Sequence, residues 1–264
     1  MALQNKKSLG QNWLKDRSIL NEIAELAYGD DPEDLDATST DTVCLEIGPG
    51  LGTLTSSLLK VFPAVVAVEF DEKLANNLPK SFPGKNLTVE HADFLKFDLE
   101  NYPVLKGKYV VAGNIPYYIT SPIIQKLLET SNKPERIVLL IQKEVAERIA
   151  AKKGGHTVLS LFVQNNAGVT LGPVVGRELF TPAPKVDSQV IILEPLAHPQ
   201  IDPATFTLIK RGFSAPRKKL IKNLGQVSKE ELSSIFDKIG ISKDARPADL
   251  ELGDWEKLAE SLAS

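Results

Sequence analysis

Four groups of residues, each at the end of a short apolar run, have types suited to binding an adenine nucleoside. Residues 48–52, GPGLG, form a turn whose glycines would let a ligand approach the backbone closely. Glu69 could accept hydrogen bonds from both hydroxyls of a ribose, and Asp93 could accept one from an adenine amino group. Residues 114–117, NIPY, could bind a planar amino group.

The NIPY group is the most specific of the four. The Asn114 side-chain oxygen and the Ile115 carbonyl could each accept one N–H of an amino group, while Pro116 holds that carbonyl rigid. Tyr117 could stack on the ring that carries the amino group. The alternative is a strand-end turn with a core tyrosine. We therefore predict that these four residues bind a planar amino group and the ring that carries it.

The glycine spacing bears on the class of nucleotide. A dinucleotide fingerprint, G-x-G-x-x-G, that began at Gly48 would place its third glycine at position 53, which is Thr53. The chain also offers no set of residues to relay a hydride. A nicotinamide oxidoreductase is therefore disfavoured, although a glycine triplet alone also fits a plain tight turn.

Short β-rich runs alternate with helical patterns through the first 195 residues. Strands are predicted at 43–48, 65–70, 87–94, 109–114, 136–142, 159–164 and 189–194, and helices at 54–62, 71–80, 121–130 and 143–153. This alternation predicts an α/β, Rossmann-like fold with a seven-stranded, mostly parallel sheet covered by helices on both faces. The last two strands have no helix between them and are expected to form an antiparallel pair at the sheet edge. Ligands of such sheets bind beyond the carboxyl ends of the strands, where all four groups fall.

A second, smaller domain is predicted after residue 198, where the β signal stops. Helical patterns cover 203–213, 216–224, 228–240 and 249–263, and Ser228 with Glu231 forms a capping-box pattern. The predicted domains are residues 1–197 and residues 198–264.

The charge is distributed unevenly along the 264 residues, whose net charge is −3. Residues 29–41 hold six acids and no base, and without them the balance would be +3. Residues 205–229 hold seven basic residues and no acid. A basic run of this kind fits either a solvated helix face or a surface for nucleic acid. The predicted phosphate-binding residues are Lys210, Arg211, Arg217, Lys218, Lys219 and Lys222.

Several classes of protein are excluded by composition. The single cysteine, Cys44, cannot form an intrachain disulfide, and three scattered histidines offer no zinc-type ligand cluster. No apolar run approaches the roughly 18 residues of a membrane helix, and the N-terminus lacks a secretory signal. We expect a cytoplasmic protein without a metal, and a monomer.

The residues together resemble a known family. The groups around Gly48, Glu69, Asp93 and Asn114 are similar to class I S-adenosylmethionine-dependent methyltransferases that act on an exocyclic adenine nitrogen. Residues 7–14, KSLGQNWL, and residues 180–188, FTPAPKVDS, resemble signatures of the ribosomal RNA adenine dimethyltransferases. Residues 213–224 resemble the basic segment of the branch that acts on the small subunit.

The resemblance implies a role for each matching position. Asn12 and Leu14 should close over the methionine end of S-adenosylmethionine, Gly48 and Gly50 should contact the cofactor, and Asn114 should lie between the cofactor and the target base. Phe180 should face the target adenine across from Tyr117. The implied substrate is a pair of adjacent adenosines near the 3′ end of small-subunit (16S) rRNA, each methylated twice, with a role in small-subunit biogenesis.

Three positions depart from the family pattern, and two related functions remain as alternatives. The acidic segment at 29–41 is an insertion, residues 154–157 (GGHT) replace a segment that commonly carries a tyrosine, and Ile115 stands where leucine is commoner. One alternative is the sister branch that methylates large-subunit rRNA and confers antibiotic resistance. The other is a ribosome-assembly factor without catalytic turnover. The glycine-rich turn and residues 213–224 favour the small-subunit branch over the large-subunit one. The intact cofactor-binding acids and Asn114 favour a working enzyme over an assembly factor.

Overall fold

The computed structural model describes residues 11–29, 42–225 and 227–263. Residues 7–10 of the N-terminal signature and residues 30–41 of the acidic insertion therefore lie outside the described residues. The chain forms two compact units, one of Met1–Ala146 with Thr170–Pro195 and one of Glu147–Val169 with Leu196–Ser264. The larger part of the second unit begins at Leu196, close to the predicted boundary at residue 198. The second unit also includes an earlier segment, residues 147–169.

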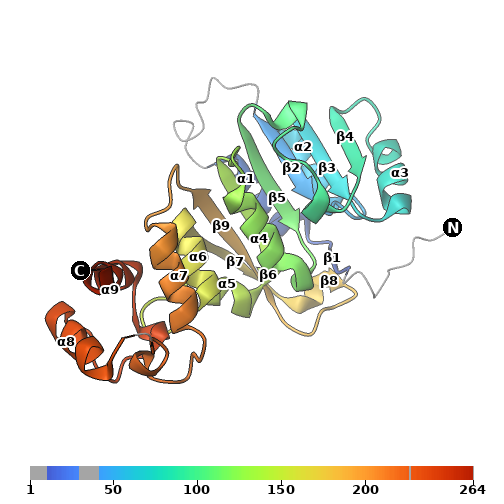
Figure 1. Ribbon diagram of the computed structural model, residues 1–264. Helices are drawn as coiled ribbons and strands as arrows, with labels where there is room; N and C mark the ends of the chain where they lie inside the picture. The colour runs from blue at the N-terminus through green and yellow to red at the C-terminus, as the bar shows by residue number, and fades with distance from the viewer. Residues whose placement is uncertain (1–10, 30–41, 226, 264) are drawn as a thin grey trace. The chain divides into compact units, whose positions relative to one another are not determined.

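The first unit is built on a seven-stranded sheet of order β4-β3-β2-β5-β6-β9-β7 (Figure 1). Its strands are β2 (Val43–Ile47), β3 (Ala64–Glu69), β4 (Leu87–His91), β5 (Tyr109–Asn114), β6 (Arg136–Gln142), β7 (Ala167–Val175) and β9 (Ser188–Pro195). Strands β2 to β6 pair in parallel, and β9 is antiparallel to β6. All five residues of β2 are buried, as expected for a central strand covered on both faces. The predicted fold class is confirmed.

Helices α1 (Arg17–Tyr28) and α2 (Thr53–Val61) pack against the sheet through one hydrophobic cluster that also contains residues of β2, β5 and β6. Helix α3 (Glu72–Ser81) packs on β3 and β4, and α4 (Thr120–Glu129) lies in front of the sheet in Figure 1. Asp71 caps α3 by accepting from the backbone N–H of Lys73 at 2.9 Å. This cap leaves the neighbouring Glu69 available for another role.

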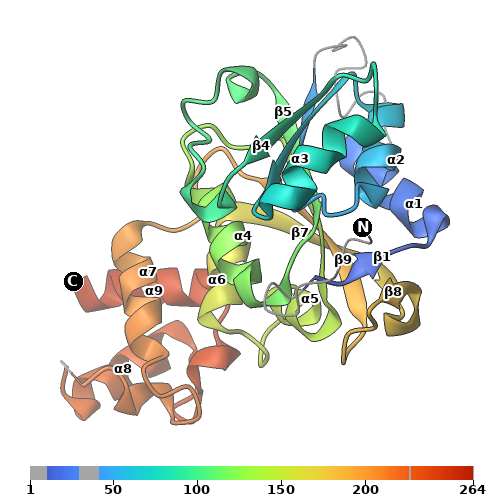
Figure 2. The same ribbon diagram turned by 90° about the vertical axis from the view of Figure 1, so that its right-hand side faces the viewer.

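A second, two-stranded sheet joins distant parts of the chain. Strand β1 (Trp13–Leu14) pairs antiparallel with β8 (Phe180–Thr181), and Figure 2 shows the two side by side. The pairing places the N-terminal arm beside the second family signature. Neither strand was predicted, because two residues carry no periodic pattern.

One predicted strand is wrong. Residues 159–164 lie in helix α6 (Val158–Asn166), and the strand beside β9 at the sheet edge is β7 instead. Thr157 starts the helix with a capping box, in which its hydroxyl accepts from the Ser160 N–H at 3.1 Å and its own N–H donates to Ser160 Oγ at 2.7 Å. A short apolar run fits a buried helix as well as a strand, so the cap decides.

The second unit is helical, with helix α6, helix α7 (Pro203–Gly212), helix α8 (Lys229–Ile239) and helix α9 (Leu252–Ala263) around one apolar core. Trp255 and Phe236 are fully buried in it. Ser228 caps α8 as predicted, since its Oγ accepts from the Glu231 N–H at 3.1 Å. Among the described residues, none of the helices combines the length and apolar character needed to span a bilayer.

Two predicted helices are shorter in the structure. Residues 216–224 contain only a 3-10 turn, Leu220–Lys222, because the Leu220 N–H donates to the Ala245 carbonyl at 2.7 Å instead of to its own segment. The helix predicted at 143–153 is α5 (Lys143–Ile149). At its end the Gln164 side chain donates to the Ile149 and Ala151 carbonyls, which the end of the helix leaves without intrahelical donors.

Candidate active site

A cavity of about 340 Å³ opens at the carboxyl ends of β2, β3, β4 and β5, within the roughly 300–1,000 Å³ common for ligand pockets. Its walls include Gly48, Gly50, Glu69, Asp93, Asn114, Ile115, Pro116 and Tyr117. The four groups that the sequence placed at strand ends therefore meet in one pocket.

The glycine-rich turn leaves room for a ligand beside its backbone. Gly48, Gly50 and Gly52 have φ values of +64°, +58° and +81°, which residues with side chains rarely adopt. A Cβ on Gly48 would meet no protein atom within 4 Å, so this side of the turn is open. A Cβ on Gly50 would lie 3.0 Å from the indole nitrogen of Trp13, which closes the other side.

Glu69 connects the turn with the second strand. Its Oε2 accepts from the Gly50 N–H at 3.0 Å, and its Oε1 accepts from the Asp71 N–H at 2.8 Å. These two bonds fix the carboxylate at the cavity wall, where its remaining lone pairs can accept further hydrogen bonds. Burial raises the pKa of Glu69, and the backbone hydrogen bonds from Asp71 and Gly50 oppose that shift.

A second carboxyl group, that of Glu46, also lines the cavity and is almost fully buried. Burial raises its pKa to about 8, with a smaller contribution from the charge of Glu69. The Thr55 hydroxyl donates to Glu46 Oε2 at 2.6 Å and opposes the shift. At neutral pH the Glu46 side chain is therefore a neutral carboxylic acid in the wall of the cavity.

The raised pKa of Glu46 predicts that the protein loses stability as the pH rises. The folded state keeps the Glu46 proton up to about pH 8, whereas the unfolded chain releases it near the ordinary value of 4.5. Between these values the folded state binds more protons, so the free energy of unfolding falls by up to about 1.4 kcal/mol per pH unit. Urea denaturation at pH 6 and pH 9 measures this loss, which Glu46→Gln should reduce. An equal loss in the variant would contradict the assignment.

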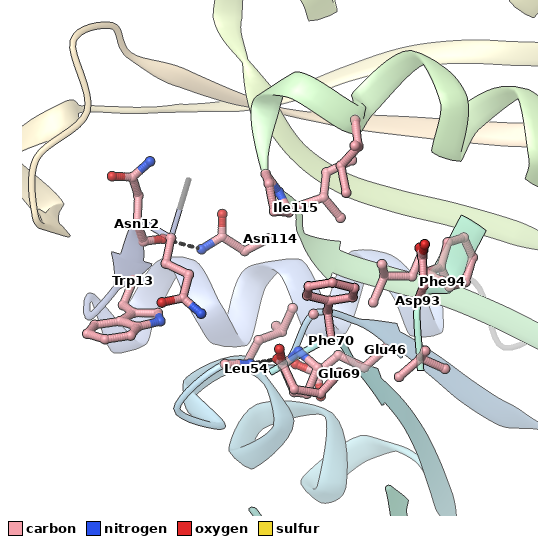
Figure 3. Close-up of a pocket in the computed structure, with 18 of the residues that line it drawn as sticks. Asn12, Trp13, Glu46, Leu54, Glu69, Phe70, Asp93, Phe94, Asn114 and Ile115 are labelled. Atoms are coloured by element: carbon pink, nitrogen blue, oxygen red, sulfur yellow. Dashed lines mark hydrogen bonds between the residues drawn. The ribbon is translucent and has the colours of Figure 1, made fainter. Parts of the chain in front are cut away.

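Asn114, at the end of β5, is oriented by the N-terminal arm. Its Nδ2 donates to the Asn12 carbonyl at 3.0 Å. Because a carbonyl can only accept, the amide must turn its NH2 toward Asn12, and Oδ1 faces the other way. Figure 3 shows this bond and the Asn114 oxygen pointing away from it. Oδ1 is therefore the side-chain atom available as an acceptor.

Tyr117 is held at its far end. Its hydroxyl forms a 2.7 Å hydrogen bond with the hydroxyl of Ser188, which is completely buried at the start of β9. Burial also raises the pKa of Tyr117, so the phenol remains neutral at ordinary pH. The bond fixes the ring beside Asn114, in a position where it can support a planar base.

The labelled residues in Figure 3 are arranged along the length of the cavity. Asn12 and Trp13 lie on one side and Asp93 and Phe94 on the other, with Glu69 and Phe70 between them. This order suits an elongated ligand with an amino-acid part, a ribose and a purine. Trp13 and Phe70 were not predicted, although Phe70 directly follows the strand-end acid, and its 59% exposure leaves the ring available to a ligand.

Two predicted site residues are not brought to the cavity. Leu14 and Phe180 are partners across the β1–β8 pair, are 0% and 4% exposed, and belong to the hydrophobic core of the first unit. Neither lines the cavity, because their apolar side chains pack with α1 and the sheet. Their position ties the arm to the sheet.

The six predicted phosphate-binding residues lie in the second unit, and all are exposed. Lys210 and Arg211 are in the last turn of α7. Arg217 and Lys218 lie in the irregular segment that follows, Lys219 forms an ion pair with Asp244, and Lys222 ends the 3-10 turn. Because this segment is not a helix, its cations do not form a helical stripe.

Comparison with known proteins gives consistent results. A family described as ribosomal RNA adenine dimethylase matches residues 2–264. Ribosomal RNA small subunit methyltransferase A of Dehalococcoides mccartyi (strain CBDB1) is 37% identical, over 99% of this chain and 90% of that protein. The protein of the same name from Nostoc sp. is 40% identical, over 97% of both chains.

Two solved structures share the fold over nearly the whole chain. A dimethyladenosine transferase from Plasmodium falciparum has a TM-score of 0.75 and 27% identity, and covers 93% of this chain and 95% of its own. The 23S rRNA methyltransferase ErmE has a TM-score of 0.74 and 28% identity, and covers 96% of this chain and 100% of its own. The two curated relatives and ErmE are thus named as rRNA methyltransferases, and the Plasmodium falciparum protein as a dimethyladenosine transferase.

Proposed function

Because the chain belongs to the ribosomal RNA adenine dimethylase family, we propose that it dimethylates the N6 amino groups of two adjacent adenosines near the 3′ end of small-subunit rRNA. The observation that carries this proposal is the cavity in which Glu69, Asp93 and the oriented Asn114 meet. Glu69 can accept from ribose hydroxyls and Asp93 from a purine amino group. The Asn114 amide oxygen can accept from a second amino group.

The cavity residues fit S-adenosylmethionine, which when bound supplies an electrophilic methyl group on a positively charged sulphur. Glu69 would hold the ribose hydroxyls, and Asp93 would accept from the adenine amino group. The open space beside Gly48 would admit the methionine chain that extends from the ribose, and Asn12 would contact the amino-acid end of that chain. The product is S-adenosylhomocysteine.

The residues at the end of β5 would activate the target amino group. In adenine the N6 lone pair is delocalised into the ring, so the nitrogen is a weak nucleophile. Asn114 Oδ1 and the Ile115 carbonyl would each accept one N–H, which localises the lone pair as positive charge develops on nitrogen. Tyr117 would stack on the adenine once it has left its neighbours in the RNA, and the released proton would go to water.

The small-subunit substrate is favoured over the large-subunit one by the relatives. The curated proteins named for the small subunit are 37% and 40% identical to this chain, whereas the 23S enzyme is 28% identical. We also propose that the protein acts in the cytoplasm as a monomer. Its one cysteine is buried as a free thiol, which suits a reducing compartment.

The helical unit would bind RNA phosphates, and its salt dependence tests this. Arg217→Ala with Lys218→Ala should lower RNA affinity and reduce the slope of log affinity against log salt by about 1.5, since each phosphate contact contributes about 0.7–0.9. Lys219→Ala should have a smaller effect, because Lys219 is already paired with Asp244. An unchanged slope in the double variant would remove this segment from the RNA interface.

Methyl incorporation from labelled S-adenosylmethionine tests the whole proposal. The substrates are small subunits that lack the modification and, in parallel, naked large-subunit rRNA. We expect dimethyladenosine in the small-subunit RNA alone. Label in the large-subunit RNA alone would identify the sister activity, and bound cofactor without label in either would identify an assembly factor.

A further inference from the structure

Lys126, in the last turn of α4, reaches across to the turn that follows β4. Its ammonium donates to the Leu95 carbonyl at 3.0 Å and to the Phe97 carbonyl. It also lies over the ring of Phe94, 5.6 Å from the centroid, close enough for a cation–π interaction. Three residues of one short turn are thus contacted by a single cation.

This turn forms the purine side of the cavity. It is a 3-10 turn, Phe94–Lys96, that begins at Asp93, and Asp93 Oδ1 accepts from the Leu95 N–H at 3.0 Å. Asp93, Phe94 and Leu95 all line the cavity. The direction of the Asp93 carboxylate therefore depends on the position of the turn.

So short a helical turn has few internal hydrogen bonds to hold it in place. Its last carbonyls need donors from elsewhere, and Lys126 supplies two. Partial burial lowers the pKa of Lys126, while the charges of Asp93 and Asp98 oppose that shift. The lysine is thus fixed at both carbonyls and also acts electrostatically on the carboxylate at the other end of the turn.

We propose that Lys126 is a positioning residue that makes the cavity selective for a 6-aminopurine. It holds the 93–97 turn so that the Asp93 carboxylate accepts from a 6-amino group and repels a 6-oxo group. The inference rests on the proposed function, because that function places the cofactor purine at Asp93. Helix α4 begins soon after Tyr117, so the same helix supports both the cofactor purine and the target base.

Calorimetric binding of two ligands tests this role without any turnover. S-adenosylhomocysteine carries the 6-amino group, and S-inosylhomocysteine carries a 6-oxo group instead. In Lys126→Met, which keeps an unbranched stem over Phe94, the Kd for S-adenosylhomocysteine should rise about tenfold. The Kd for S-inosylhomocysteine should change less than threefold, so selectivity falls. Lys126→Arg, which keeps the charge and donors, should restore most of it.

Lys60→Met is the matched control, since Lys60 also lies in the last turn of a helix and donates to a side chain, that of Asn21, at 3.3 Å. It should leave both Kd values unchanged. If Lys126→Met weakens both ligands equally, or neither, the positioning role is wrong. If the wild type fails to bind S-adenosylhomocysteine, the cofactor assignment itself fails, and this inference with it.

Discussion

Asn114→Ala is expected to lower kcat at least about a hundredfold, the scale for losing one polar group that stabilises a transition state. The side chain presents its oxygen because its NH2 is held by the Asn12 carbonyl. Alanine removes the acceptor and, at the same time, the hydrogen bond to the Asn12 carbonyl. Single-turnover methylation of small subunits, with cofactor at saturation, measures the chemical step apart from cofactor binding.

The control for this substitution is Asn77→Ala, on the exposed side of α3, which should leave the rate unchanged. Asn114→Asp separates the two roles of the side chain. Its carboxylate still accepts from the substrate but cannot donate to the Asn12 carbonyl, so the bond to the arm is lost while the acceptor remains. Turnover of Asn114→Ala within a few-fold of wild type would exclude Asn114 as the acceptor.

Glu69→Gln should weaken binding of S-adenosylhomocysteine roughly a hundredfold, because hydrogen bonds to a charged group contribute about 1.5–3 kcal/mol each. The carboxylate already accepts from the N–H groups of Gly50 and Asp71. A glutamine would turn its NH2 toward one of these donors and lose an acceptor for the ribose. Isothermal titration calorimetry at pH 7 measures the change.

A 2′-deoxy analogue shows whether the loss comes from the ribose. The wild type should prefer the ribose form, and Glu69→Gln should bind both forms nearly equally. Glu72→Gln, at the exposed first residue of α3, is the matched control and should retain the preference for the ribose form. A preserved preference in Glu69→Gln would move the ribose away from this residue.

The strand-end residues could be predicted because parallel sheets place the carboxyl ends of their strands together. Glu69 and Asn114 are the last residues of two strands and Asp93 follows a third, and each lies at the cavity as expected. Local patterns sufficed for them, since each depends only on the strand before it.

The remainder depended on contacts between distant residues. Leu14 and Phe180 enter the core through a two-residue pairing that has no sequence pattern. The Leu220 N–H finds the Ala245 carbonyl, so a segment with helical spacing stays irregular. Lys126 acts through carbonyls on another element, and a carbonyl gives no signal in the residue type.

The pairing of β1 with β8 sets an order in which parts of the chain can fold during synthesis. A growing chain emerges from its N-terminus, so the arm leaves the ribosome first but cannot dock until Phe180 and Thr181 have followed. Until then β1 has no partner strand, and Trp13 and Leu14 cannot take their places in the two-stranded sheet. The two-stranded sheet therefore forms only late in translation, when most of the first unit has been made.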